Sequence, residues 1–259
     1  MTEKNIQAFA DDLFNAEQTR IQIQPLTETD SSLTVDDAYA IQMANIARAE
    51  AMGHVISGKK IGLTSVGIQT QLGVHEPDYG HLFAAMDCVD GKADCSQLIQ
   101  PKIEAEIAFV LAADLVGGEV TAEDVRAATD YVVGAFEIVD SRVDNWRIKL
   151  PDTVADNASS GRYVLGKEHF NINDVDLPTV SMKLYKNGEL METGTGSEVL
   201  GDPAVSVAWL ANKLWGYGVT LKKGEVVLSG AFSAAPVAVK GDKFRVDFTT
   251  FGTLEAEFV

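Results

Sequence analysis

The chain has 259 residues, and its 38 acidic and 21 basic side chains give it a formal net charge of −17 at pH 7. With 46% hydrophobic and 23% charged residues, it has the composition of a globular protein with a sizeable core, which excludes disorder for most of its length. The negative charge repels nucleic acid and anionic membrane surfaces, so neither is expected as a partner. An anionic metabolite would need a local cation to bind.

The N-terminus and the cysteines are typical of a soluble cytoplasmic protein. No basic region precedes an apolar run, so no signal peptide is expected, and the longest apolar stretch, near residues 107–113, is far shorter than the roughly 20 residues of a membrane span. Cys88 and Cys95 lack CxxC spacing and are expected to be unpaired thiols. None of the four histidines has zinc-type spacing with another histidine or cysteine.

Two helices are predicted near the N-terminus. Residues 5–16 repeat apolar side chains at the spacing of an amphipathic helix. Thr34 and Asp37 form a capping-box pattern that predicts the start of a second helix, which should end near Gly53. We therefore expect residues 1–55 to form a helical appendage, packed on a β-rich catalytic body of residues 56–259.

Two further helices are predicted within the body. The capping-box pattern of Thr121–Asp124 opens a helix whose apolar side should include Val132. Asp202 followed by Pro203 has the pattern of an N-cap and a first helical residue, and this helix should end near Trp215.

The rest of the body is predicted to be mainly strands. Apolar and polar residues alternate over residues 180–184, 244–248 and 254–258, and Asn187-Gly188 predicts a hairpin after the first of these strands. Because helices and strands do not alternate regularly, the pattern predicts an α+β fold with a mixed, β-rich body, not a doubly wound parallel sheet.

The segment 101–111 is the most informative for chemistry. In a strand, Glu104 and Glu106 project from one face while the intervening apolar residues project from the other. Two carboxylates in a dry place repel each other, and a divalent cation such as Mg²⁺, Mn²⁺ or Ca²⁺ resolves that conflict. The alternative is that both are solvated on a half-exposed strand, and this segment alone slightly favours that alternative.

A second acidic segment favours the metal hypothesis. Glu137 lies within an apolar, strand-like run, and a third carboxylate facing the first two would complete a ligand set with open positions. Asp140 lies on the opposite face of this run and is expected to form a structural ion pair with Arg142 or to orient the ligands.

Three other segments carry polar groups with two interpretations each. Lys59 and Lys60 could both be surface lysines. Alternatively, one of them points inward and serves as a local cation or proton carrier. The loop 74–82 contains Asp78 and two histidines, and is either a pocket wall or a plain turn. Residues 152–161 are rich in small polar side chains, and form either a capped loop or an irregular segment with donors for a carboxylate.

Taken together, these segments resemble the 2-keto-4-pentenoate hydratase family of the fumarylacetoacetate hydrolase superfamily, which acts in meta-cleavage breakdown of aromatic compounds. Each motif is weak alone, but their order is highly specific and covers nearly the whole chain. The motifs are GKKIGLTS at 58–65, VHEPDYGHL at 74–82, PKIEAEIAFVL at 101–111, FEIVDSR at 136–142, WRIKLPDTVADNASSG at 146–161, KNGEL at 186–190 and KKGEVVLSG at 222–230.

The resemblance implies a role for each candidate residue. The implied ligands of Mg²⁺ or Mn²⁺ are Glu104, Glu106 and Glu137, the implied acid–base residues are Lys60 and Asp78, and Ser160 and Asn157 are implied to lie near the substrate carboxylate. The implied reaction is hydration of 2-hydroxypenta-2,4-dienoate (2-oxopent-4-enoate) to 4-hydroxy-2-oxopentanoate. The family also implies a homo-oligomer that can associate with a pathway aldolase or decarboxylase.

Three alternatives remain open at this level. The related 4-oxalocrotonate decarboxylases share the acidic set, the lysine and the DNASS segment. Asp78 and residues 146–149 look hydratase-like, whereas residues 234–237 resemble the decarboxylases. A non-catalytic companion subunit is a second alternative, and carbon–carbon bond hydrolysis, which would need His75 or His81 to assist a water, is a third.

Overall fold

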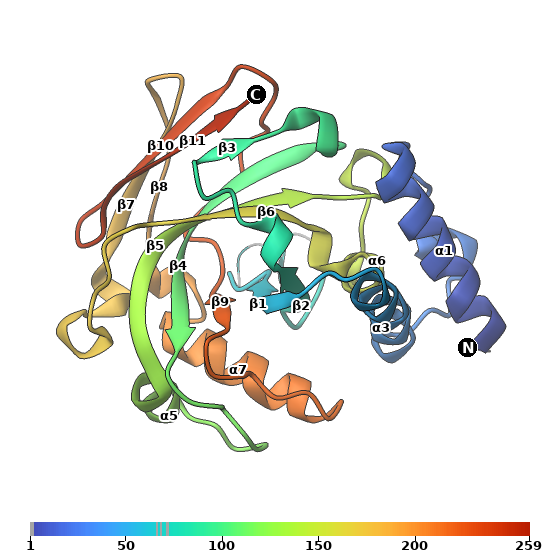
Figure 1. The fold of residues 1–259 in the computed structure, drawn as a ribbon, viewed down its shortest axis with the longest axis horizontal. Helices are drawn as coiled ribbons and strands as arrows, with labels where there is room; N and C mark the ends of the chain where they lie inside the picture. Colours follow the sequence, from blue (N-terminus) through green and yellow to red (C-terminus); the bar gives the residue numbers. More distant parts are fainter. Residues whose placement is uncertain (1–2, 66, 68, 71–72) are drawn as a thin grey trace.

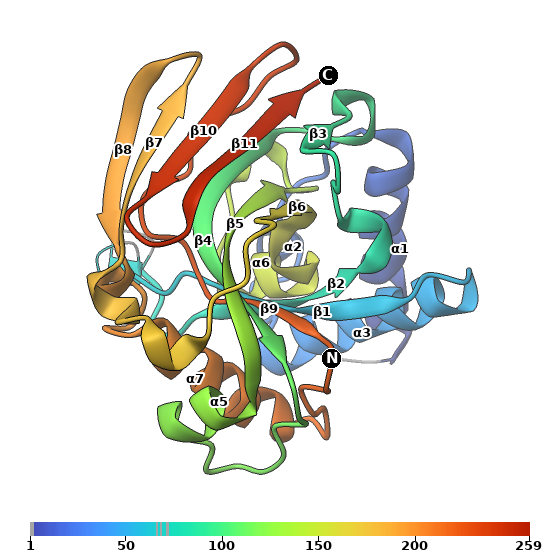
Figure 2. The same cartoon turned by 60° about the vertical axis from the view of Figure 1, so that its left-hand side comes forward.

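The computed structural model describes residues 3–65, 67, 69–70 and 73–259. Two β-sheets form the body (Figures 1 and 2). The larger sheet has the order β2-β1-β9-β4-β5-β6, and its strands are β1 (Ile56–Gly62), β2 (Asp78–Phe83), β4 (Pro101–Leu111), β5 (Thr129–Asp140), β6 (Ser160–Leu165) and β9 (Val226–Leu228). The smaller sheet has the order β3-β11-β10-β7-β8, and its strands are β3 (Lys92–Ala93), β7 (Ser181–Lys186), β8 (Glu189–Thr195), β10 (Lys243–Phe248) and β11 (Gly252–Phe258).

The larger sheet curls so that its two edges approach each other. Ser57 on β1 and Tyr163 on β6 bring their hydroxyl oxygens within 3.2 Å, although three strands separate β1 from β6 in the sheet. A small buried cluster fills the concave side with side chains from β2, β4, β5, β6 and β9, namely Leu82, Ala108, Val133, Ala135, Tyr163 and Leu228. The concave side is therefore enclosed, and polar groups at one end of it are shielded from water.

Helices surround the sheets, as the α+β prediction requires. They are α1 (Glu3–Thr19), α2 (Leu26–Thr29), α3 (Val35–Ala51), α5 (Ala122–Ala128), α6 (Leu150–Ala155) and α7 (Pro203–Trp215). The predicted caps are confirmed, because Thr34, Thr121 and Asp202 each accept a hydrogen bond from a backbone N–H in the first turn of their helix. Asn187-Gly188 joins β7 to β8, as predicted.

The helices before β1 share a hydrophobic core with the body. Leu13 of α1 and Ile41 of α3 belong to the same buried cluster as Ile103 of β4 and Phe136 of β5. Figure 1 shows α1 and α3 side by side at one edge of the molecule, with α6 between them and the sheet. The division into an appendage of residues 1–55 and a body of residues 56–259 stays a prediction.

Two local predictions differ from the structure. Val132 lies in β5, not in the helix that begins after Thr121, because α5 ends at Ala128 and the β-branched run that follows pairs with β4. Residues 150–155 form α6, with a proline in its first turn, whereas the sequence indicated an irregular segment there.

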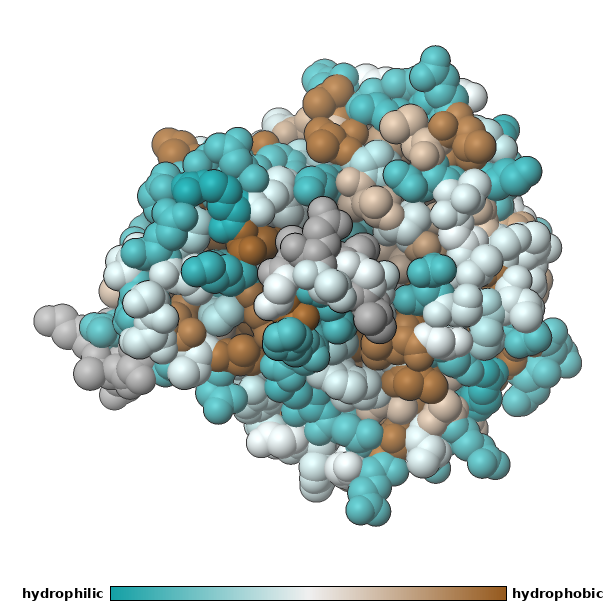
Figure 3. Space-filling model, turned by 180° about the vertical axis from the view of Figure 1, so that it is seen from behind, coloured by the Kyte–Doolittle hydropathy of each residue, from teal (hydrophilic) through white to brown (hydrophobic). Residues whose placement is uncertain are grey.

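The surface and the cysteines agree with the composition. Cys88 and Cys95 are unpaired, as predicted. On the face drawn in Figure 3, hydrophobic side chains form several separate groups among hydrophilic ones. In the described part of the chain, every helix is too short or too polar to cross a membrane.

Candidate active site

Three glutamates meet on the concave face of the larger sheet. In the antiparallel pairing of β4 with β5, Glu104 lies directly opposite Glu137, and Glu106 lies two residues further along β4. Because side chains alternate along a strand, this register places all three on one face. Each offers a carboxylate oxygen within 4.8 Å of the others. The structure thus brings together the three carboxylates that the sequence suggested as a set.

This acidic cluster is short of positive charge. Glu106 and Glu137 are fully buried, and Glu106 Oε1 and Glu137 Oε2 have no hydrogen-bond donor among the described residues. Glu106 Oε2 accepts one hydrogen bond, from the Gly230 N–H at 2.8 Å. Burial, followed by the charges of Glu137 and Glu104, raises the pKa of Glu106 well above its usual value. Orphaned carboxylate oxygens at this spacing fit a hard divalent cation, which would neutralise the cluster.

Lys60 is the positive group that faces the cluster. Its Nζ lies 3.2 Å from Glu137 Oε1 and 4.0 Å from Asp78 Oδ1, and it donates a hydrogen bond to the Ala158 carbonyl at 2.9 Å. Burial alone would lower the pKa of Lys60, but the carboxylates, led by Glu137 and then Asp78, raise it above its ordinary value. Burial in turn raises the pKa of Glu137 to about 8, although Lys60 opposes this shift.

Lys59 points to the other face of β1. Its Nζ lies 2.8 Å from Glu225 Oε1, and Lys59 is buried whereas Glu225 is half-buried. Neither lysine is therefore the surface lysine that was the ordinary expectation, and strand alternation assigns Lys60 to the site.

Asp78 opens β2 next to Lys60. It pairs with Gly62 of β1 and is buried, and its Oδ2 accepts a hydrogen bond from Thr153 Oγ1 at 2.6 Å. Its Oδ1, which faces Lys60, has no hydrogen-bond donor among the described residues. One carboxylate oxygen is thus anchored by α6, and the other is bound by no donor of the described residues.

A left-handed segment supplies the carbonyl that binds Lys60. Asn157, Ala158 and Ser159 have φ values of 54°, 50° and 52°, a conformation that L-residues rarely adopt in succession. The Asn157 side chain holds this segment against β2, accepting from the His81 N–H at 2.7 Å and donating to the His81 carbonyl at 2.9 Å. Its amide is thereby engaged with the backbone.

Ser160 keeps an unpartnered hydroxyl. It pairs with Val139, two residues beyond Glu137 on β5, so the register places its side chain on the concave face. Its Oγ is buried and has no hydrogen-bond partner among the described residues.

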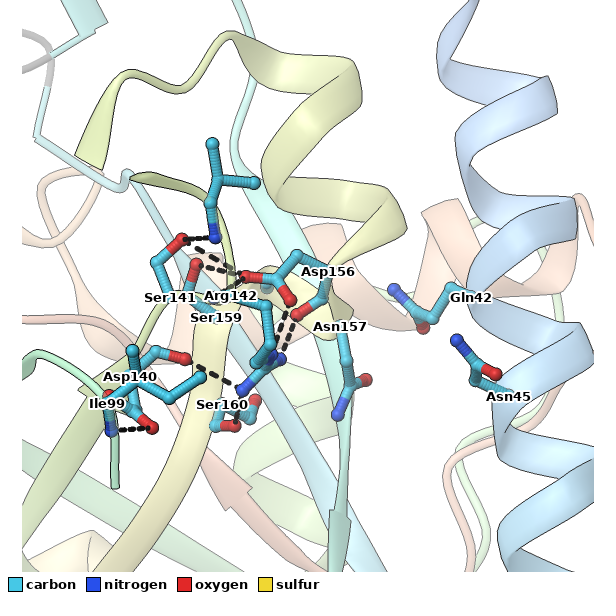
Figure 4. Close-up of polar contacts among 12 residues, drawn as sticks. Gln42, Asn45, Ile99, Asp140, Ser141, Arg142, Asp156, Asn157, Ser159 and Ser160 are labelled. Atoms are coloured by element: carbon cyan, nitrogen blue, oxygen red, sulfur yellow. Dashed lines mark hydrogen bonds and ion pairs between the residues drawn. The ribbon is translucent and has the colours of Figure 1, made fainter. Parts of the chain in front are cut away.

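Arg142 stabilises both ends of the left-handed segment (Figure 4). Its guanidinium forms an ion pair with the carboxylate of Asp156 and also donates to the Asp156 carbonyl. It donates to the Ser160 carbonyl as well, at 2.9 Å. The expected ion pair of Arg142 with the Asp140 side chain is wrong, because that carboxylate instead accepts the backbone N–H groups of Ile99 and Gln100.

Some functional groups carried no clear signal in the sequence. The Ala158 carbonyl and the Gly230 N–H are backbone groups, which any residue type provides, and Thr153 lies in the helix that was not predicted. Only the three-dimensional fold identifies them.

The histidines do not take part in this constellation. His81 lies on the face of the sheet that carries Lys59, and its Nδ1 is 3.0 Å from Gln42 Oε1. Burial, with a smaller effect of Lys59, lowers its pKa to about 3. His75 is exposed. Neither is placed to support the hydrolase alternative.

Comparison with known proteins identifies the family of this chain. A family model described as fumarylacetoacetate (FAA) hydrolase C-terminal matches residues 82–259. The 2-hydroxyhexa-2,4-dienoate hydratase of Comamonas testosteroni is 45% identical over 249 residues, covering 95% of this chain and 94% of that protein. The 2-keto-4-pentenoate hydratase of Paraburkholderia xenovorans is 45% identical over 259 residues, covering 100% of this chain and 96% of that protein.

A solved structure extends the likeness to three dimensions. The 4-oxalocrotonate decarboxylase from Pseudomonas putida G7, complexed with magnesium and adipate, superposes with a TM-score of 0.96 at 40% sequence identity. The match covers 100% of this chain and 99% of that chain.

Proposed function

Because the chain belongs to the fumarylacetoacetate hydrolase family, we propose that it is a divalent-metal-dependent hydratase of 2-hydroxypenta-2,4-dienoate or a close alkyl homologue. The product would be 4-hydroxy-2-oxopentanoate, and the reaction belongs to meta-cleavage catabolism of aromatic compounds. The full-length relatives named as hydratases support the reaction class. The observation that carries the proposal is the cluster of half-buried Glu104 with buried Glu106 and Glu137 beside Lys60 and Asp78.

The three glutamates would hold Mg²⁺ or Mn²⁺. The unpartnered oxygens of Glu106 and Glu137 are the observation that such an ion fits. When bound, the ion supplies Lewis-acid polarisation of the 2-oxo group and positive charge for the substrate carboxylate. This explains how a protein with a net charge of −17 binds an organic anion.

Lys60 and Asp78 would move the protons. The Lys60 ammonium is held by the Ala158 carbonyl at 2.9 Å, so its remaining N–H groups are oriented toward Glu137 and Asp78 and can exchange a proton with the carbon framework. The free Oδ1 of Asp78 would position or deprotonate the water that adds to C4 of the conjugated keto acid. Ser160 Oγ would donate to the substrate carboxylate, and Asn157 would hold the left-handed segment in place.

Product analysis tests the reaction. The purified protein should convert the dienoate to the hydroxy keto acid in the presence of Mg²⁺, and should release no CO₂ from 2-oxo-3-hexenedioate. CO₂ release without hydration would assign the protein to the decarboxylases instead.

The decarboxylase is the second candidate because two observations favour it. A decarboxylase superposes over the full chain, and residues 234–237 have a sequence that resembles that group. Asp78 favours the hydratase, because it places a carboxylate oxygen with no hydrogen-bond donor beside Lys60, where a water could be activated.

Metal binding tests the ligand set. The variant Glu106→Gln removes one buried charge without changing the size of the side chain, so it should fold, lose Mn²⁺ binding in a calorimetric titration and lose turnover. Full turnover in Glu106→Gln would reject the metal assignment. Absence of Mn²⁺ binding in the unmodified protein would favour a non-catalytic companion subunit.

The assembly and the location of the protein are part of the same proposal. We expect a cytoplasmic homo-oligomer, with association to a pathway aldolase or decarboxylase, as the family resemblance implies. Light scattering on the purified protein measures the subunit number, and a monomer at micromolar concentration would contradict this expectation.

A further inference from the structure

A cavity of about 300 Å³ lies between the N-terminal helices and the body. Its walls come from α1, α3, the end of β2 and residues 155–162. Asn157 and Ser160 line it, whereas the three glutamates, Lys60 and Asp78 do not. Figure 4 shows Gln42 and Asn45 pointing from α3 toward the segment that carries Asn157, across this space. Its volume is at the lower end of the range for small-molecule sites.

Two arginines without ion pairs line this cavity. Five of the seven arginines have a carboxylate oxygen within 4.0 Å, namely Arg48, Arg126, Arg142, Arg147 and Arg245. The other two, Arg20 and Arg162, have none among the described residues, and both line the cavity. In a chain with 38 acidic side chains, two unpaired arginines at one cavity are unexpected.

The hydrogen bonds of these arginines leave donors unused. Arg20 Nη2 donates to Gln97 Oε1 at 2.8 Å, whereas its Nε and Nη1 are buried with no acceptor among the described residues. Arg162 Nη1 donates to the carbonyl of Gly161 at 2.9 Å. Arg20 and Arg162 are both half-buried, so an anion in the cavity would bind through the N–H groups that stay accessible, not through the two enclosed Arg20 nitrogens.

The charges around the cavity leave a net positive balance. Arg142 and Asp156 neutralise each other in their ion pair. Glu17, the remaining acidic residue of the lining, is exposed and opposes the two unpaired arginines with a single charge. Burial raises the pKa of the nearby Asp140, and the Arg20 charge opposes this shift less than Arg142 and the backbone N–H groups that already bind that carboxylate.

Apolar side chains form the rest of the lining, including Leu13, Ile46, Phe83 and Met86. We propose that this cavity binds a small carboxylate with an apolar body, such as an aromatic or short alkyl acid, with its charged end at Arg20 and Arg162. The apolar wall would take up the ring or chain, and the arginines would supply charge-assisted hydrogen bonds. This site does not include the glutamate cluster, and Ser160 is the residue that it shares with the proposed substrate site.

Titration calorimetry with benzoate on the Mg²⁺-loaded protein tests this site. The unmodified protein and the metal-site variant Glu106→Gln should both bind one equivalent. Arg20→Gln and Arg162→Gln should each bind about ten-fold or more weakly, while their turnover of the dienoate stays near the unmodified value. Arg245→Gln is the matched control, because it removes an arginine charge elsewhere on the surface and should bind normally.

Three other outcomes of these measurements would overturn the proposal. Binding that disappears in Glu106→Gln but persists in the two cavity variants would place benzoate at the metal centre. Equal binding of inorganic phosphate would show that the apolar wall contributes nothing. A change of subunit number in Arg20→Gln or Arg162→Gln, measured by sedimentation, would make the cavity a contact between copies of the chain.

Discussion

Lys59 and Lys60 are adjacent in the chain but have separate roles in the structure. Their side chains alternate across β1, so Lys60 faces Glu137 and Lys59 forms its ion pair with Glu225. The sequence alone does not show which of the two lysines points into the site, because the residues on either side of them fit both orientations of the strand. The pairing of β1 with β2 and β9 removes this ambiguity, because it fixes which side chains of β1 lie on the concave face of the sheet.

This pair offers a matched test at the residue scale. Lys60→Met should lower turnover by ~10²–10⁴-fold, the usual contribution of a positioned acid–base group, and should leave the folded state intact. Lys59→Met should keep turnover but lose about 3 kcal/mol of unfolding free energy, because Glu225 then loses its buried partner. Steady-state kinetics and urea unfolding measure the two effects. The assignment fails if the two variants show the reverse pattern.

Asp78 separates two steps of the proposed reaction. Its Oδ2 accepts a hydrogen bond from Thr153, whereas its Oδ1 has no hydrogen-bond donor among the described residues. Oδ1 is therefore the oxygen that is available to a water. Asp78→Asn should therefore slow water addition more than ketonisation of the dienol, which ultraviolet absorbance follows directly. Equal losses in both steps would contradict this division of roles.

At the scale of elements, the sequence predicts local structure well where a side chain specifies it. Thr34, Thr121 and Asp202 begin helices as their capping patterns indicate. The convergence of Glu137 with Glu104 was not predictable from spacing, because it depends on which residue of β5 lies opposite β4. The Arg142–Asp156 pair was missed because it joins two segments through a turn of unusual backbone conformation.

The contact of β2 with the left-handed segment is close enough to test. A Cβ on Gly80 would lie 2.4 Å from the Asn157 carbonyl oxygen, so one of the two segments must shift. Gly80→Ala should therefore move the Ala158 carbonyl away from Lys60 and lower kcat, while Mn²⁺ binding to the glutamates persists. Gly216→Ala is the control, because its φ of −59° suits any residue and its nearest neighbour, the Lys213 carbonyl oxygen at 3.3 Å, needs to shift by only a few tenths of an ångström. Unchanged kcat in Gly80→Ala would show that this carbonyl does not position Lys60.

The whole molecule combines a strong net negative charge with a buried acidic cluster. Repulsion among 38 acidic side chains acts over the Debye length, which falls from about 30 Å at 0.01 M salt to about 8 Å at 0.15 M. Added salt should therefore stabilise the fold without any specific site. The acidic cluster inside the curled sheet is shielded from such screening, so a bound ion, and not added salt, would relieve its repulsion.

Thermal unfolding at constant ionic strength separates these two effects. With NaCl adjusted to compensate, MgCl₂ should raise the midpoint temperature in a saturable way, because an ion that binds only the folded state adds about 2.7 kcal/mol at 100 times its dissociation constant. Glu106→Gln should lose this saturable increase but keep the NaCl effect, since it removes one charge of the cluster and leaves the surface unchanged. If MgCl₂ and NaCl acted alike at matched ionic strength, the ion would be a screening ion, and the glutamates would not form a metal site.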